Sequence, residues 1–170
     1  MFSLFSGQWE EFATMISGRK FAASIVQGNT LHVFGGRSLN TTEIIYEDGQ
    51  IVQGPDMPIA VDQHAIASVN STTSIISGGE DYCCSNAHDD SPTWYYNHVT
   101  QQFQAGPSLI VGRKYHSSGT VIDQDTKEKI VAVAGGIHGE GEYLSSTELL
   151  IDGEWRDGKS QSAQLKLFIF

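Results

Sequence analysis

The stretch IVAVAGG, residues 130–136, is a run of small and branched apolar residues that ends on two adjacent glycines. Two other stretches have the same form, LHVFGG at 31–36 and TSIISGG at 73–79. Short runs of strand-forming residues that end at glycine are typical of buried β-strands. A nucleotide-binding loop needs Gly-x-x-x-x-Gly-Lys-Ser/Thr, or Gly-x-Gly-x-x-Gly opening a helix, and neither pattern follows Gly136. We therefore interpret the glycines as packing positions at strand ends.

Other positions recur together with the double glycines, which indicates an internal repeat. A large apolar residue at position 51, 103 or 155 is followed three positions later by Gly54, Gly106 or Gly158. Asp-Gly pairs at 48–49 and 152–153 predict tight hairpin turns just before two of these positions. We expect four short strands in each of three repeats, at about 19–57, 61–109 and 113–160.

These recurring positions resemble the repeat of the kelch family. The family's repeat has Arg and His near its start, a double glycine after its second strand, Tyr in its third and Trp in its fourth. The resemblance assigns structural roles to ten residues here, namely Gly35, Gly36, Gly78, Gly79, Gly135, Gly136, Trp9, Trp155, His64 and His116. Arg113 and Tyr46 also match the family pattern, whereas Val61, Ala22 and Ile51 depart from it.

The resemblance implies an all-β fold in one domain, 1–170. This would be a kelch-type β-propeller segment with about three four-stranded antiparallel blades and one N-terminal strand. Propellers typically close with about 4 to 8 blades, so we expect an incomplete propeller. Its open edges favour self-association or completion by further blades. Residues 161–170 do not continue the repeat, and their apolar end could cover such an edge.

Composition narrows the function classes. A formal net charge of −10 argues against a nucleic-acid partner, because binding phosphates requires basic residues. No apolar run is long enough to predict a membrane span, and the N-terminus lacks the features of a signal peptide. Adjacent Cys83 and Cys84 provide no disulfide framework. A cytoplasmic location is favoured; the alternative is extracellular, where Asn40 and Asn70 would be glycosylation sites.

The predicted partner-binding surface lies where two kinds of loop meet. In an up-and-down blade, the loops after the second strand emerge on the same face as the segments that lead into the first strand. By resemblance to the kelch domains of ubiquitin-ligase adaptors, this face would bind a partner peptide or protein, and the arginines suit an acidic peptide. The predicted contact residues are Arg19, Arg37, Arg113, Glu80, Asp81 and His138. An alternative is that the arginines pair with neighbouring carboxylates.

Catalysis is not expected. EDYCCSNAHDD at 80–90 contains thiol, imidazole and carboxylate groups, but its spacing fits no zinc signature. Ser117 lacks the Gly-x-Ser-x-Gly context of a hydrolase nucleophile. We predict no cofactor and no metal site. The leading hypothesis is a protein-binding module, with a role as a ubiquitin-ligase substrate adaptor. The alternatives are a fragment of an extracellular, metal-dependent kelch or galactose-oxidase-like enzyme and a cytoskeletal scaffold.

Overall fold

The computed structural model describes residues 2–3, 7–9, 11–81, 92–123, 126–139 and 141–158. Every regular element in these ranges is a β-strand, so the all-β prediction is confirmed. The strands form three four-stranded antiparallel sheets and three two-stranded pairs. One four-stranded sheet lies within each of the three predicted repeats.

The three large sheets are meanders, in which each strand pairs with the next one along the repeat. Sheet 1 contains β3 (Ala23–Gln27), β4 (Thr30–Phe34), β5 (Thr42–Tyr46) and β6 (Ile51–Gln53). Sheet 2 contains β8 (Ala65–Ser68), β9 (Thr73–Ser77), β11 (Thr93–Asn97) and β12 (Gln102–Ala105). Sheet 3 contains β13 (Ser117–Ile122), β14 (Lys129–Ala134), β17 (Thr147–Ile151) and β18 (Glu154–Asp157).

The three short pairs lie outside these sheets. They are β1 (Phe2–Ser3) with β2 (Gln8–Trp9), β7 (Val61–Asp62) with β10 (Glu80–Asp81), and β15 (Ile137–His138) with β16 (Glu142–Tyr143). The predicted strand around Trp9 therefore exists, and among the described residues it pairs with β1 and joins none of the three large sheets. Its indole is 81% exposed, whereas the equivalent Trp155 is buried. The tail at 161–170 lies outside the described residues.

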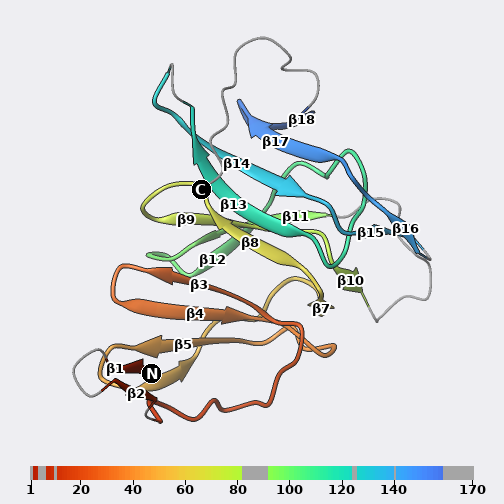
Figure 1. The fold of residues 1–170 in the computed structure, drawn as a ribbon. Coiled ribbons are helices and arrows are strands. Elements are labelled where there is room, and N and C mark those ends of the chain that lie inside the picture. The colour runs from red at the N-terminus through yellow and green to blue at the C-terminus, as the bar shows by residue number, and fades with distance from the viewer. Residues whose placement is uncertain are drawn as a thin grey trace.

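Sheet 2 lies between sheets 1 and 3 (Figure 1). The first strands of the three sheets are neighbours, because β8 contacts both β3 and β13. We call β3, β8 and β13 the inner strands. Two apolar clusters fill the spaces between successive sheets. Met57 belongs to the cluster between sheets 1 and 2, and Leu109 occupies the same repeat position between sheets 2 and 3.

A threonine at the start of each third strand explains the glycines at 54 and 106. The Thr42 hydroxyl donates a hydrogen bond to the Pro55 carbonyl over 2.7 Å, and the Gly54 amide donates to the Thr42 carbonyl. Thr93 makes the same contact with Pro107 over 2.7 Å, next to Gly106. A side chain at either glycine would overlap the threonine hydroxyl. The chain can thus turn sharply after the fourth strand and cross to the next sheet.

Candidate functional site

The segments that lead into the inner strands and the loops that follow the second strands lie together, as the repeat predicts. We call residues 16–22, 58–64 and 110–116 the lead-in segments. In the second repeat, β7 of the lead-in segment pairs with β10, which directly follows the double glycine. In the third repeat, Lys114 and Ile137 form an isolated antiparallel bridge. We call the surface formed by the lead-in segments and by the loops that follow the double glycines the loop face. The loop face is the candidate site.

The first two double glycines are close-packed junctions between sheets. All six glycines of the three pairs have positive φ, between 56° and 100°, which favours glycine. The Gly36 amide donates to the Val61 carbonyl over 3.0 Å, and the Gly79 amide donates to the Arg113 carbonyl over 2.9 Å. A Cβ atom at Gly35 would lie 2.6 Å from the Val61 carbonyl oxygen. The glycines thus allow the backbone of one sheet to approach the lead-in segment of the next.

Arg19 and Arg113 do not lie on the surface, although both were predicted to contact a partner. The Arg19 guanidinium lies 2.8 Å from Glu43 and also donates to the carbonyls of Gly35 and Thr41. Its side chain is only 3% exposed. A carboxylate in the third strand of the same sheet takes up the charge, so a partner peptide cannot reach it. The alternative interpretation, pairing with a neighbouring carboxylate, describes the structure.

Arg113 repeats this arrangement in sheet 3. Its Nη2 lies 2.7 Å from Glu148, and its Nη1 donates to the Gly135 carbonyl. Glu148 also accepts hydrogen bonds from the backbone amides of Ile110 and Val111. Each arginine therefore connects a lead-in segment, a double glycine and a third strand. These roles are structural, and we leave Arg19 and Arg113 out of the proposed binding surface.

Sheet 2 replaces both members of this ion pair with apolar residues. Val61 occupies the arginine position and Trp94 the glutamate position, and both belong to the apolar cluster between sheets 1 and 2. A lone arginine or glutamate here would be a buried charge without a partner, which is costly. The departure of Val61 from the repeat pattern is thus matched by a second change in the third strand.

The two repeat histidines pack against the double glycine of the preceding sheet. A Cβ atom at Gly35 would lie 3.1 Å from Cε1 of His64, and one at Gly78 would lie 2.6 Å from Cε1 of His116. Burial lowers the pKa of His64 to about 4. Burial, followed by the charge of Arg113, lowers the pKa of His116 to about 3. Both imidazoles are therefore neutral at pH 7 and serve in packing.

The other predicted contact residues lie on the loop face, but most have partners within the chain. Glu80 forms an ion pair with Lys114 at 2.9 Å. His138 donates through Nδ1 to the Gly112 carbonyl over 2.7 Å. Asp81 is half-buried in β10. Arg37 is exposed, directly after the first double glycine.

Two aromatic residues on this face were not among the predicted contacts. Phe21 and Tyr115 occupy the third position of RKF and RKY, and Gln63 has the same position in the middle lead-in segment. The Gln63 amide donates to the Phe21 carbonyl, and the Tyr115 amide donates to the Gln63 carbonyl, both over 3.0 Å. The Phe21 and Tyr115 rings meet edge to face, with centroids 5.8 Å apart. They are 47% and 52% exposed.

Asp62, next to Gln63 in the middle lead-in segment, is a buried carboxylate with one unpaired oxygen. Asp62 is 1% exposed, and its Oδ1 receives no hydrogen bond from the described residues. Burial raises the pKa of Asp62, and the charge of Glu80 raises it further, against the opposing charges of Lys20 and Lys114. The Oε1 atom of Gln63 is also buried without a partner. The loop face thus combines exposed aromatic rings with buried acceptor atoms that receive no hydrogen bond from the described residues.

Several other residues singled out in the sequence can be located relative to the described ranges. The described residues contain no group of three metal-ligating side chains, and Cys83, Cys84 and His88 lie outside the described ranges. Asn40 is half-buried, whereas Asn70 is exposed and its Oδ1 caps a turn by accepting the amides of Thr72 and Thr73. In the part of the chain that the structure covers, no helix could cross a membrane.

Comparison with known proteins leaves the family open. No protein-family model matches this chain, and no curated protein matches it either.

Proposed function

We propose that this chain is a protein-binding module of the kelch-propeller type, and that its partner contacts the loop face. Three observations support the proposal: the repeated four-stranded meanders, the neighbouring inner strands, and the junctions made by the double glycines. A scaffold of this kind holds its loops in fixed positions, and binding residues are often found on such loops. The role of ubiquitin-ligase adaptor stays a prediction of the family resemblance alone.

The exposed contact between Phe21 and Tyr115 carries the proposal. Aromatic side chains bury a large area at low entropic cost and are enriched among the residues that dominate protein interfaces. These two rings are half-exposed, yet their backbones are fixed by hydrogen bonds to Gln63. A partner would therefore meet an apolar surface that is already ordered, so little entropy is lost on binding.

Further exposed apolar side chains lie on the same segments. Ile16 and Ile110 have equivalent places in the first and third lead-in segments and are 61% and 56% exposed. Tyr143 in β16 is 85% exposed. The amides of Ile16 and Ile110 each donate to the buried glutamate of their own sheet, which fixes the backbone beneath these side chains. The partner surface we propose is therefore apolar and aromatic rather than cationic.

A peptide-display selection tests this function. Peptides selected on the wild-type chain would be titrated against the Phe21→Ala/Tyr115→Ala double variant. We expect about tenfold weaker binding or more, because two central aromatic contacts are removed. The matched control is Val99→Ala/Ile122→Ala, which removes one exposed side chain from a turn and one from the end of β13, both outside the loop face. Equal binding by the wild type and both double variants would overturn the proposal, as would a selection that yields no peptide.

A further inference from the structure

The two junctions between sheets use the same pair of backbone hydrogen bonds. In one bond, the second glycine of a sheet donates to the lead-in segment of the next, as Gly36 does to Val61 and Gly79 does to Arg113. The other bond joins the residues at the position of Phe21, Gln63 and Tyr115. The Gln63 amide donates to the Phe21 carbonyl, and the Tyr115 amide donates to the Gln63 carbonyl. Each junction thus requires two groups from each sheet.

The same groups remain unpaired at the two ends of the row of sheets. At sheet 3, the Gly136 amide and the Tyr115 carbonyl have no hydrogen-bond partner in the described part of the chain. At sheet 1, the same holds for the Phe21 amide and the Arg19 carbonyl. The Gly136 amide at one end therefore matches the Arg19 carbonyl at the other, and the Tyr115 carbonyl matches the Phe21 amide.

Side-chain packing at the end of sheet 3 also has space for a neighbour. A Cβ atom at Gly135 would meet only the Leu144 carbonyl, at 3.7 Å, among the described residues. At the equivalent Gly35, the next lead-in segment fills this space. Ala134 is exposed, whereas Phe34 and Ser77, at the same position in sheets 1 and 2, are fully buried. The face that covers a following sheet in the first two repeats is thus open in the third.

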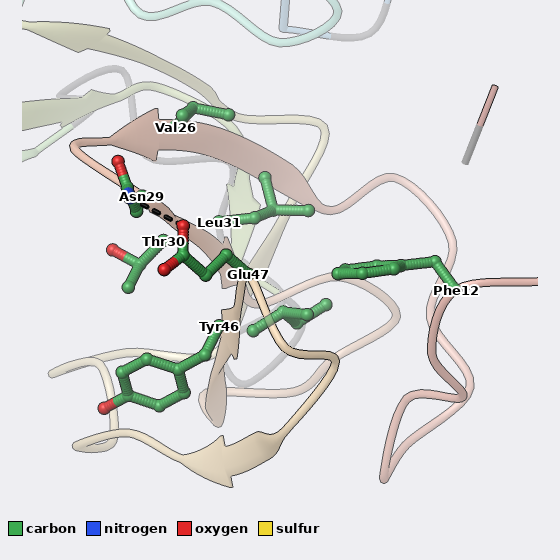
Figure 2. A pocket seen from close by; sticks show the side chains of 8 residues that line it. Phe12, Val26, Asn29, Thr30, Leu31, Tyr46 and Glu47 are labelled. Carbon is green, nitrogen blue, oxygen red and sulfur yellow. Dashed lines mark hydrogen bonds between the residues drawn. The ribbon is translucent and has the colours of Figure 1, made fainter. Parts of the chain in front are cut away.

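The outer face of sheet 1 is partly open: Ile45 is buried, Leu31 is half-buried and Val26 is exposed. An open pocket of about 350 Å³ lies against this sheet, and Ile45 is among its lining residues. Phe12 lies across the pocket from Leu31 (Figure 2). Val26, at its rim, is 66% exposed. Its counterpart in sheet 3 is Thr120, whose hydroxyl donates to the Ser68 carbonyl of the preceding sheet. Val26 therefore occupies a position that contacts a preceding sheet where one is present.

We propose that a second copy of this chain docks head to tail, with sheet 1 of one copy against the open face of sheet 3 of the other. The new junction repeats the two internal ones, pairing Gly136 with the Arg19 carbonyl and the Phe21 amide with the Tyr115 carbonyl. Two such junctions close a ring of six sheets, within the range of about 4 to 8 blades that propellers use. This inference rests on the propeller arrangement in the proposed function, and it completes the loop face around the ring.

The new junction is weaker than the internal ones for two reasons. Ala22 replaces the histidine that fills the junction in sheets 2 and 3, so less surface is buried. Each copy also carries a formal charge of −10, and the two copies repel one another. Salt screens this repulsion, so association is expected to strengthen as ionic strength rises.

Sedimentation velocity of the full chain across the micromolar range tests the proposal. We expect a reversible monomer–dimer equilibrium. Ala134→Glu and Val26→Glu each place a carboxylate at one side of the junction, and each is expected to weaken dimerisation by about tenfold or more. Both positions are exposed in the single chain, so the variants should fold. The control, Ala105→Glu, makes the same change on the exposed outer strand β12 and should dimerise as the wild type does.

Mixing the two glutamate variants tests the head-to-tail geometry. In a mixed dimer, one junction carries both substitutions and the other carries neither, so mixing should restore association. A back-to-back dimer would instead leave one of the single variants unaffected. A chain that stays monomeric at every concentration and salt level overturns the proposal, as does a mixture that fails to associate. Peptide binding through Phe21 and Tyr115 is measured separately, so its survival in a monomer would show that only this inference has failed.

Discussion

Arg113 and Glu148 form a buried ion pair at 2.7 Å, and Arg19 and Glu43 repeat it at 2.8 Å. In each pair, the glutamate also accepts two backbone amides from the lead-in segment. Burial alone would raise the pKa of Glu43, but the Arg19 hydrogen bonds and the amides of Ile16 and Ser17 outweigh it and hold the pKa below its usual value. The pairs thus anchor the lead-in segments to sheets 1 and 3.

Removing one partner of this pair is expected to be far more costly than removing both. Arg113→Met leaves Glu148 buried without its counter-ion and should lower the free energy of unfolding by about 3 to 5 kcal/mol. The double variant Arg113→Met/Glu148→Leu should lose much less, because sheet 2 already uses an apolar pair at these positions. Urea denaturation measures both values. Equal losses in the single and double variants would contradict the role given to the ion pair.

Alanine substitutions at two glycines are expected to separate the cost of a steric clash at the added Cβ atom from the cost of backbone strain. Gly79→Ala places a Cβ atom 2.6 Å from the Asp62 carbonyl oxygen at a φ of 100°. Gly28→Ala is the control, because its φ is also positive, at 58°, but no atom lies within 4 Å. The control should lose about 1 kcal/mol from strain. Gly79→Ala should lose about 1 to 3 kcal/mol more, because overpacking adds to strain. Thermal unfolding of the two variants distinguishes these values, and similar losses would show that the junction has room to adjust.

Acidification should destabilise the protein through its buried histidines. Burial lowers the pKa of His64 and of His98 to about 4, and burial with the charge of Arg113 lowers that of His116 to about 3. In the unfolded chain these groups take up a proton near pH 6.5. The unfolded state therefore binds more protons as the pH falls below 6.5, and the stabilisation that is complete above this value is lost progressively toward pH 3.

Each of these histidines contributes at most about 1.4 kcal/mol per pH unit to this loss. Asp62 acts in the opposite direction, because its raised pKa makes the folded state bind a proton first. Urea denaturation between pH 7 and pH 4 measures the slope, and His116→Gln should make it shallower. A wild-type stability that stays constant over this range would contradict the burial of neutral histidines.

The sequence predicts the repeat well because glycine positions are set by local geometry. Each double glycine follows a short apolar run and takes a positive φ, so both signals lie within a few residues of each other. The three meanders follow from these columns and from the Asp-Gly turns. The strands occupy only part of each predicted repeat, since the first repeat is predicted from about residue 19 and its first strand begins at Ala23.

The site was harder to predict because its contacts span distant parts of the chain. Arg19 and Arg113 resemble surface cations, and their partners Glu43 and Glu148 lie in third strands that are otherwise apolar. A signal was present, because the glutamate recurs in TEIIY and TELLI and is replaced, together with the arginine, in the second repeat. Phe21 and Tyr115 recur in RKF and RKY, but their contact depends on a positive φ that bulky residues rarely adopt, so the sequence does not indicate that the two rings meet.

The apolar pair Val61 and Trp94 makes the middle repeat insensitive to conditions that weaken ionic contacts. Protonation of Glu43 in strong acid would remove its ion pair with Arg19 and free the first lead-in segment, whereas Val61 and Trp94 would still hold the second by apolar contact. Equivalent positions of the repeat are thus anchored by charge in sheets 1 and 3 and by apolar contact in sheet 2, so a condition that loosens one lead-in segment leaves the anchor of its neighbour in place.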